Sequence, residues 1–166
     1  MTPIKLVLDT NIVIDWLVFK DVRMNVLREA TQDRRITLIT HPPALDELRR
    51  VLTYAQFKLD AARQCEVFGA YQAQAVVATL PGGFSLDHLM LPAEFPRCRD
   101  RDDEHFLALA YHAGADALAS KDKALLRLRK RAGKFGMKIV NVAQLIELAE
   151  VGPACAPAVG SELGSF

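Results

Sequence analysis

The chain has 166 residues, of which 51% are hydrophobic, so its length and composition are those of one folded domain with a substantial core. A formal net charge of +1 identifies no partner by bulk charge, and three widely spaced cysteines argue against a disulfide framework or a C-x-x-C zinc site. No apolar run reaches the length of a membrane span, and the N-terminal apolar run is interrupted by acids and lacks a small-residue cleavage site. We therefore expect a cytoplasmic protein without a signal peptide.

Short hydrophobic runs alternate with segments of helical period along the chain. In chain order the pattern predicts a strand at 4–8, helices within 11–19 and near 21–31, a strand at 36–39, a helix within 41–52, a long helix at 57–79, an irregular segment at 80–96, a helix at 103–113, a strand at 116–119, a basic helix at 122–131, a strand at 138–140 and a helix at 142–149. Strands that alternate with helices indicate an α/β fold with a parallel sheet covered on both faces. We assign residues 1–150 to one domain and expect the small-residue tail, 151–166, to be loosely held.

The stretch "KLVLDTNIVI" places Asp9 directly after the first predicted strand. In open α/β sheets, chemistry gathers at the carboxyl ends of the strands, so Asp9 is a candidate site residue. The alternative is a helix N-cap, because Asp, Thr and Asn all cap well.

Glu47 lies early in the helix that follows the second predicted strand, and so belongs to the same edge of the sheet. On a helical wheel of about 100° per residue, it borders an apolar arc that includes Leu48, whereas Asp46 falls on the solvated side. The alternative is an ordinary surface pair with Arg50 at i,i+3.

The run "CRDRDDEHFLALAYHAGAD" places Asp103 amid an apolar arc that includes Phe106 and Leu107, while His105 and His112 should face away. A carboxylate in such an arc is unusual, because a buried charge is costly without a partner. This helix precedes a strand, so its N-terminus should lie at the edge that carries Asp9. The alternative is that the acids of this run only complement the helix dipole.

Asp122 follows the predicted strand at 116–119 and opens the basic helix, where capping by Ser120 or Asp122 is a strong alternative. Four segments thus bring carboxylates to one edge, and their repulsion is expensive unless cations occupy the site. Oxygen ligands select hard ions, so we expect Mg²⁺ or Mn²⁺ rather than Zn²⁺. The histidines have no metal-ligand spacing and are interpreted as surface or loop residues: His41, His88, His105 and His112.

The segments "VLDTNIVI", "ALDELRRVL", "DRDDEHFLALA" and "ASKDKALL", in this order, resemble the PIN-domain family, and most closely its VapC-like toxin nucleases. The similarity covers roughly residues 4–145. It implies a three-layer α/β/α sandwich with a central parallel sheet and an endoribonuclease that depends on Mg²⁺ or Mn²⁺. Carried over by position, the catalytic, metal-binding acids are Asp9, Glu47, Asp103 and Asp122, supported by Thr10, Asn11 and Ser120. The resemblance also implies a homodimer and a small antitoxin protein as partner.

The run from 121 to 138 is strongly basic within a near-neutral chain, and it begins beside the proposed site. It could follow an RNA backbone, although a solvated helix face is the simpler interpretation of such a run. The candidate RNA-binding residues are Lys121, Lys123, Arg127, Arg129 and Lys130. Lys121 also departs from the family pattern, which usually has a small or neutral residue between Ser120 and Asp122.

Two other classes of function stay open. A phosphatase of the haloacid-dehalogenase type would use Asp9 as nucleophile, but such enzymes usually carry a second Asp where this chain has Asn11. A non-catalytic PIN scaffold would act through protein contacts, although all four acids are present.

Overall fold

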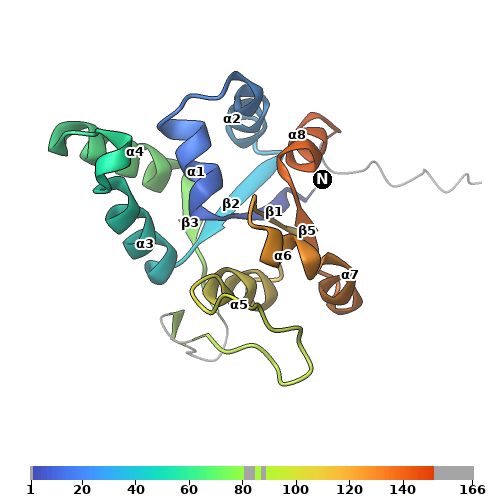
Figure 1. The fold of residues 1–166 in the computed structure, drawn as a ribbon. Helices are drawn as coiled ribbons and strands as arrows, with labels where there is room; N and C mark the ends of the chain where they lie inside the picture. Colours follow the sequence, from blue (N-terminus) through green and yellow to red (C-terminus); the bar gives the residue numbers. More distant parts are fainter. Residues whose placement is uncertain (1, 81–84, 87–88, 152–166) are drawn as a thin grey trace, which may run out of the picture.

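The computed structural model describes residues 2–80, 85–86 and 89–151, and these residues form a five-stranded parallel sheet with helices on both faces (Figure 1). The strand order is β3-β2-β1-β4-β5. The strands are β1 (Ile4–Leu8), β2 (Ile36–Thr40), β3 (Ala75–Val77), β4 (Ala117–Ala119) and β5 (Lys138–Val140). Every neighbouring pair is parallel, so all five strands point their carboxyl ends to one edge of the sheet.

The helices lie in two layers. They are α1 (Thr10–Leu17), α2 (Asn25–Gln32), α3 (Pro42–Leu52), α4 (Ala61–Gln74), α5 (Glu104–His112), α6 (Lys123–Arg127), α7 (Arg129–Ala132) and α8 (Val142–Val151), with 3₁₀ turns at Val22–Met24, Ala55–Phe57 and Gly133–Phe135. Figure 1 shows α5, α6 and α7 on one side of the sheet and α1, α2 and α8 on the other, with α3 and α4 near β3. The predicted three-layer α/β/α sandwich is confirmed.

Alternation along the strands builds two separate cores. Leu6 and Leu8 of β1 pack with Trp16 and the other apolar residues of the α1 layer, whereas Val7 packs with Leu107 in the α5 layer. Because helices cover both faces, the central strand reads as a nearly continuous hydrophobic run and not as alternating polar and apolar residues.

Two predicted elements differ from the structure. The long helix expected over 57–79 is shorter and spans Ala61–Gln74, and the next three residues form the edge strand β3 beside β2. The basic helix expected over 122–131 is divided at Leu128 into α6 and α7. The predicted tail begins at residue 151, but Val151 is the last residue of α8, and residues 152–166 lie outside the described residues. So do residues 81–84 and 87–88 of the irregular segment, which include His88.

The register between β1 and β4 fixes the start of the candidate site. Leu8 is paired with Ala119, so Asp9 and Ser120 are the next residues on two adjacent strands. The backbone N–H of Asp9 donates to the carbonyl of Ala119 at 3.0 Å, which extends the ladder by one step. Among the described helices, none combines the length and apolar character needed to cross a bilayer.

Candidate active site

Four acids from four segments gather at the carboxyl edge of the sheet. Asp9 follows β1, Asp122 follows β4, Glu47 lies on α3, and Asp103 immediately precedes α5. They interact electrostatically: Asp9 is repelled by Glu47 and Asp122, and Asp103 is repelled by the other three. The edge predicted from the strand ends is therefore the place where these carboxylates meet.

Asp9 is buried, with only 2% of its surface exposed, and it accepts two hydrogen bonds. As N-cap of α1 it accepts the backbone N–H of Asn11 at 2.9 Å, and the hydroxyl of Ser120 donates to its other oxygen at 2.6 Å. Burial still raises the pKa of Asp9, aided by repulsion from nearby acids, because these hydrogen bonds offset only part of the lost hydration. Asp9 therefore caps α1, as the alternative interpretation of the sequence proposed, and its ionised carboxylate is also destabilised by burial.

Ser120 connects the first acid to the fourth. Its hydroxyl donates to Asp9 and accepts the backbone N–H of Asp122 at 2.9 Å. Asp122 in turn caps α6, accepting N–H groups of Ala124 at 2.6 Å and Leu125 at 3.1 Å, both on Oδ1. The capping alternative is correct for Asp122 also, and the cap does not use the second carboxylate oxygen.

Glu47 is bound by a residue on another helix. Nε2 of His105 lies 2.7 Å from Oε2 of Glu47, and both side chains are mostly buried, at 24% and 18% exposed. Burial would raise the pKa of Glu47, but hydrogen bonds from His105 and from the hydroxyl of Thr10 outweigh it, so the pKa is lowered. Glu47 therefore stays charged and is tied to both α5 and the start of α1.

The surface pair on α3 involves other residues than those expected. Asp46 pairs with Arg49 at 3.0 Å, with 73% of the Asp46 side chain exposed, which confirms that Asp46 is solvated. Arg50 contributes to Glu47 only a Coulombic effect on its pKa.

Two histidines belong to this site, contrary to their interpretation as surface or loop residues. His105 was expected to face away from the apolar arc, but α3 packs across α5, so this side of α5 faces Glu47. His41, 1% exposed, stands between β2 and α3 with its ring centroid 5.3 Å from that of His105. Burial, and then the neighbouring His105, lower the pKa of His41 to about 4, so it is neutral near pH 7. His112, by contrast, fits its expected place: its Nε2 lies 2.7 Å from the carbonyl of Met90 in the loop before α5.

A sequence signal for His41 existed: it follows β2 as Asp9 follows β1, and the same strand-end rule applies to both. The signal for His105 was weaker, because its partner lies 58 positions away along the chain.

Asp103 and Asp102 differ as the helical wheel predicts. Asp103 is half-buried, and its side chain makes no capping hydrogen bond to α5, so the helix-terminus alternative gains no support from a cap. Burial first, and then repulsion from Asp9 and Asp122, raise the pKa of Asp103 to about 7. Asp102 is exposed, and its backbone N–H donates to Asp100 at 3.0 Å.

A family model of the PIN domain matches residues 5–124. The chain belongs to the PIN-domain family. No match is found among the curated proteins. PIN domains are commonly nucleases and typically use divalent metal ions. The matched range contains all four acids of the carboxyl edge, His41 and His105.

The acids of this PIN domain fit a hard cation by their chemistry. Their ligand atoms are all oxygens, which is the donor type that hard cations prefer. Burial and mutual repulsion raise the pKa values of Asp9 and Asp103, and a bound cation would favour their ionised forms. Within the described ranges, however, no three side chains of the His, Cys, Asp or Glu type are arranged to hold a metal ion. The ligand set Asp9, Glu47, Asp103 and Asp122 therefore stays a prediction.

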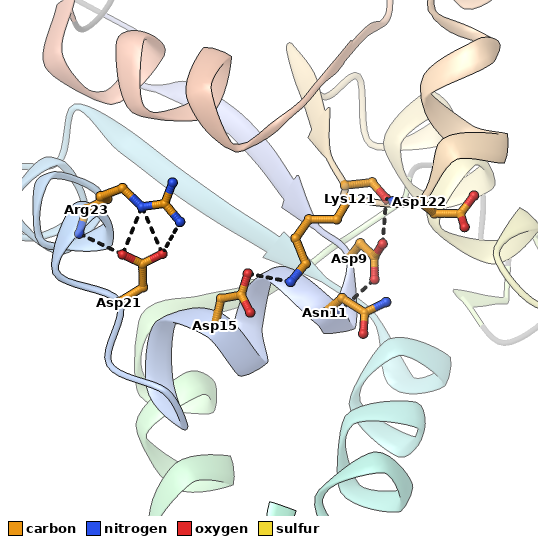
Figure 2. A network of polar contacts seen from close by, with 8 residues as sticks. Asp9, Asn11, Asp15, Asp21, Arg23, Lys121 and Asp122 are labelled. Atoms are coloured by element: carbon orange, nitrogen blue, oxygen red, sulfur yellow. Dashed lines mark hydrogen bonds and ion pairs between the residues drawn. The ribbon is translucent and has the colours of Figure 1, made fainter. Parts of the chain in front are cut away.

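Lys121, which departs from the family pattern, pairs with an acid on α1 and not with the four acids of the carboxyl edge. Its ammonium lies 2.7 Å from Oδ2 of Asp15 on α1 (Figure 2). The other basic candidates are exposed on α6 and α7: Lys123, Arg127, Arg129 and Lys130. Their exposure agrees both with an RNA-binding surface and with a solvated helix face.

We expect Asp9→Asn to leave the metal-free free energy of unfolding equal or higher. The amide oxygen can still cap α1, while one of several mutually repelling charges is removed. The measurement is urea unfolding in EDTA. Asp46→Asn, at an exposed acid, is the control and should change stability by no more than about 0.5 kcal/mol. A large loss in Asp9→Asn would mean that the contacts of the charged form dominate.

Asp103→Asn should stabilise the metal-free protein at alkaline pH. The pKa of Asp103 is about 7 in the fold against an ordinary value of 3.8, so the folded state binds this proton more tightly than the unfolded state does. This group therefore makes the native protein more stable as the pH falls from about 8 to about 4. The advantage of Asp103→Asn should be largest near pH 8 and vanish near pH 4 in urea unfolding. An advantage that is independent of pH would contradict the elevated pKa, and Asp102→Asn is the matched control.

Proposed function

We propose that this PIN domain is an endoribonuclease that requires Mg²⁺ or Mn²⁺ and hydrolyses RNA phosphodiester bonds. The observation that carries the proposal is the convergence of four carboxylates at one edge of the sheet: Asp9, Glu47, Asp103 and Asp122. Burial and repulsion from the other acids raise the pKa of Asp103 to about 7. Structural acids placed only to cap helices would have no reason to crowd in this way. These four carboxylates would hold the cation.

A bound hard cation would supply charge neutralisation at the scissile phosphate and a water of lowered pKa. The chain's own groups prepare the site. Ser120 orients the Asp9 carboxylate by its 2.6 Å hydrogen bond, and the helix cap fixes the Asp122 carboxylate. The metal chemistry needs no protein nucleophile. The family resemblance implies products with a 5′-phosphate and a 3′-hydroxyl.

The RNA backbone would run over the basic surface beside the acids. Lys123 and Arg127 on α6, with Arg129 and Lys130 on α7, are exposed and follow directly from the Asp122 cap. Lys121 is the weakest of these candidates, because Asp15 already binds its ammonium. Phosphate contacts of this kind would make RNA affinity fall with salt.

The toxin role belongs to the same proposal. The four motifs resemble VapC-like toxins, which supports a small antitoxin protein as inhibitor and a homodimer as the working form. The cysteine pattern supports a cytoplasmic location, and Cys65 and Cys98 are both free thiols in the structure.

Cleavage should require a divalent cation. We expect cutting of end-labelled RNA oligonucleotides in Mg²⁺ or Mn²⁺, complete loss in excess EDTA, and recovery when Mn²⁺ is restored. Cleavage that continues in excess chelator would exclude the metal mechanism. Mn²⁺ binding without cleavage of any RNA tested would favour a non-catalytic scaffold.

Asp103 and Asp102 should differ sharply in activity. Asp103 shares the acidic edge and Asp102 is exposed, so we expect Asp103→Asn to lose a hundredfold or more, about 3 kcal/mol in the barrier. Asp102→Asn should lose about tenfold or less, near 1.4 kcal/mol. The assay is RNA cleavage at saturating Mn²⁺, with folding checked by circular dichroism. The reverse order would assign the site to Asp102.

A further inference from the structure

His105 on α5 contacts Glu47 on α3. Its Nε2 lies 2.7 Å from Oε2 of Glu47, and the two residues are 58 positions apart. The ring is held on its other sides: its centroid is 4.0 Å from that of Phe106, which is 1% exposed, and 5.3 Å from that of His41. The imidazole is therefore held by two neighbouring rings as well as by the carboxylate.

This contact joins two elements that each carry a candidate ligand. Glu47 lies on α3, and Asp103 stands at the N-terminus of α5, two residues before His105. A glutamate side chain has several rotatable bonds, so a free glutamate loses conformational entropy when it binds a metal ion. A donor anchored on α5 removes that freedom in advance and couples the place of Glu47 to the helix that begins at Asp103.

We propose that His105 is a positioning residue that holds the Glu47 carboxylate at the acidic edge for the cation. A carboxylate accepts more than two hydrogen bonds, so the contacts from His105 and Thr10 leave acceptor capacity for a metal ion. Partners of this kind orient metal ligands in proteins, and their loss typically weakens metal binding about 10- to 100-fold. The proposal rests on the metal-dependent function proposed above.

The test measures Mn²⁺ affinity without RNA, by the electron paramagnetic resonance signal of free Mn²⁺. His105→Leu removes the donor and keeps an apolar side chain against Phe106, and we expect about 10- to 100-fold weaker Mn²⁺ binding. His105→Asn stays polar but is too short to reach Glu47, and should match His105→Leu. His105→Gln, whose amide nitrogen can reach the position of Nε2, should restore affinity to within about threefold of the parent, since it keeps the hydrogen bond.

Two controls separate positioning from general packing. His112→Leu changes a histidine on the same helix whose ring meets the carbonyl of Met90, and should leave Mn²⁺ affinity unchanged. In a Glu47→Ala background, His105→Leu should cause no further loss, because a residue that acts through Glu47 has nothing left to position. Unfolding curves in EDTA verify that each variant is folded.

The proposal is overturned if His105→Leu and His105→Asn bind Mn²⁺ as the parent does or more tightly, if His105→Gln is no better than they are, or if the loss persists without Glu47. Asp9→Asn and Asp103→Asn, measured alongside, distinguish a failure of the proposed metal site from a failure of the proposed role of His105. If these also bind Mn²⁺ normally, the metal site itself is wrong. If they lose binding while His105→Leu keeps it, only the role of His105 is wrong.

Discussion

The parallel pairing of β1 with both β2 and β4 is the constraint on which the rest of the site depends. It aligns the ends of three strands, so that the first residue beyond each is delivered to the same edge: Asp9 after β1, His41 after β2 and Ser120 after β4. The hydrogen bond from Ser120 to Asp9 then follows from register, since Leu8 is paired with Ala119. A slip of one residue would turn every side chain of β1 to the opposite face and separate this pair.

The acidic edge works against the stability of the fold that carries it. Burial and mutual repulsion raise the pKa values of Asp9 and Asp103, which means that their charged forms are unfavourable in the folded, metal-free protein. Two apolar cores, one on each face of the sheet, offset this cost. The local contacts limit it further, because the carboxylates of Asp9 and Asp122 also cap helices. Capping and ligand chemistry are therefore compatible uses of the same side chains here.

Sequence reasoning singled out the acids because their signals are local: Asp9 and Asp122 come after predicted strands, and Glu47 and Asp103 border or lie in the apolar arc of a predicted helix. It failed where the deciding partner is distant. Residues 75–77 continue an Ala- and Gln-rich helical pattern, yet pairing with β2 makes them an edge strand. His105 looked like a solvent-facing residue on the wheel of α5, and only the packing of α3 across that helix gives it Glu47 as a partner. The basic segment was correctly expected to be helical, but Leu128, buried against the second core, divides it into two short helices.

The ion pair between Lys121 and Asp15 has a consequence for the order of events. Lys121 directly precedes Asp122 in the sequence, but its ammonium pairs with Asp15 on α1. Lys121 therefore does not neutralise the carboxylates at this edge, and a polyanion that reached them without a cation would meet like charge. Under the proposed function, the cation would have to bind before the RNA backbone could settle over the acids. A nuclease of that kind would follow an ordered kinetic scheme, in which free divalent metal controls the rate of productive RNA association as well as the chemical step.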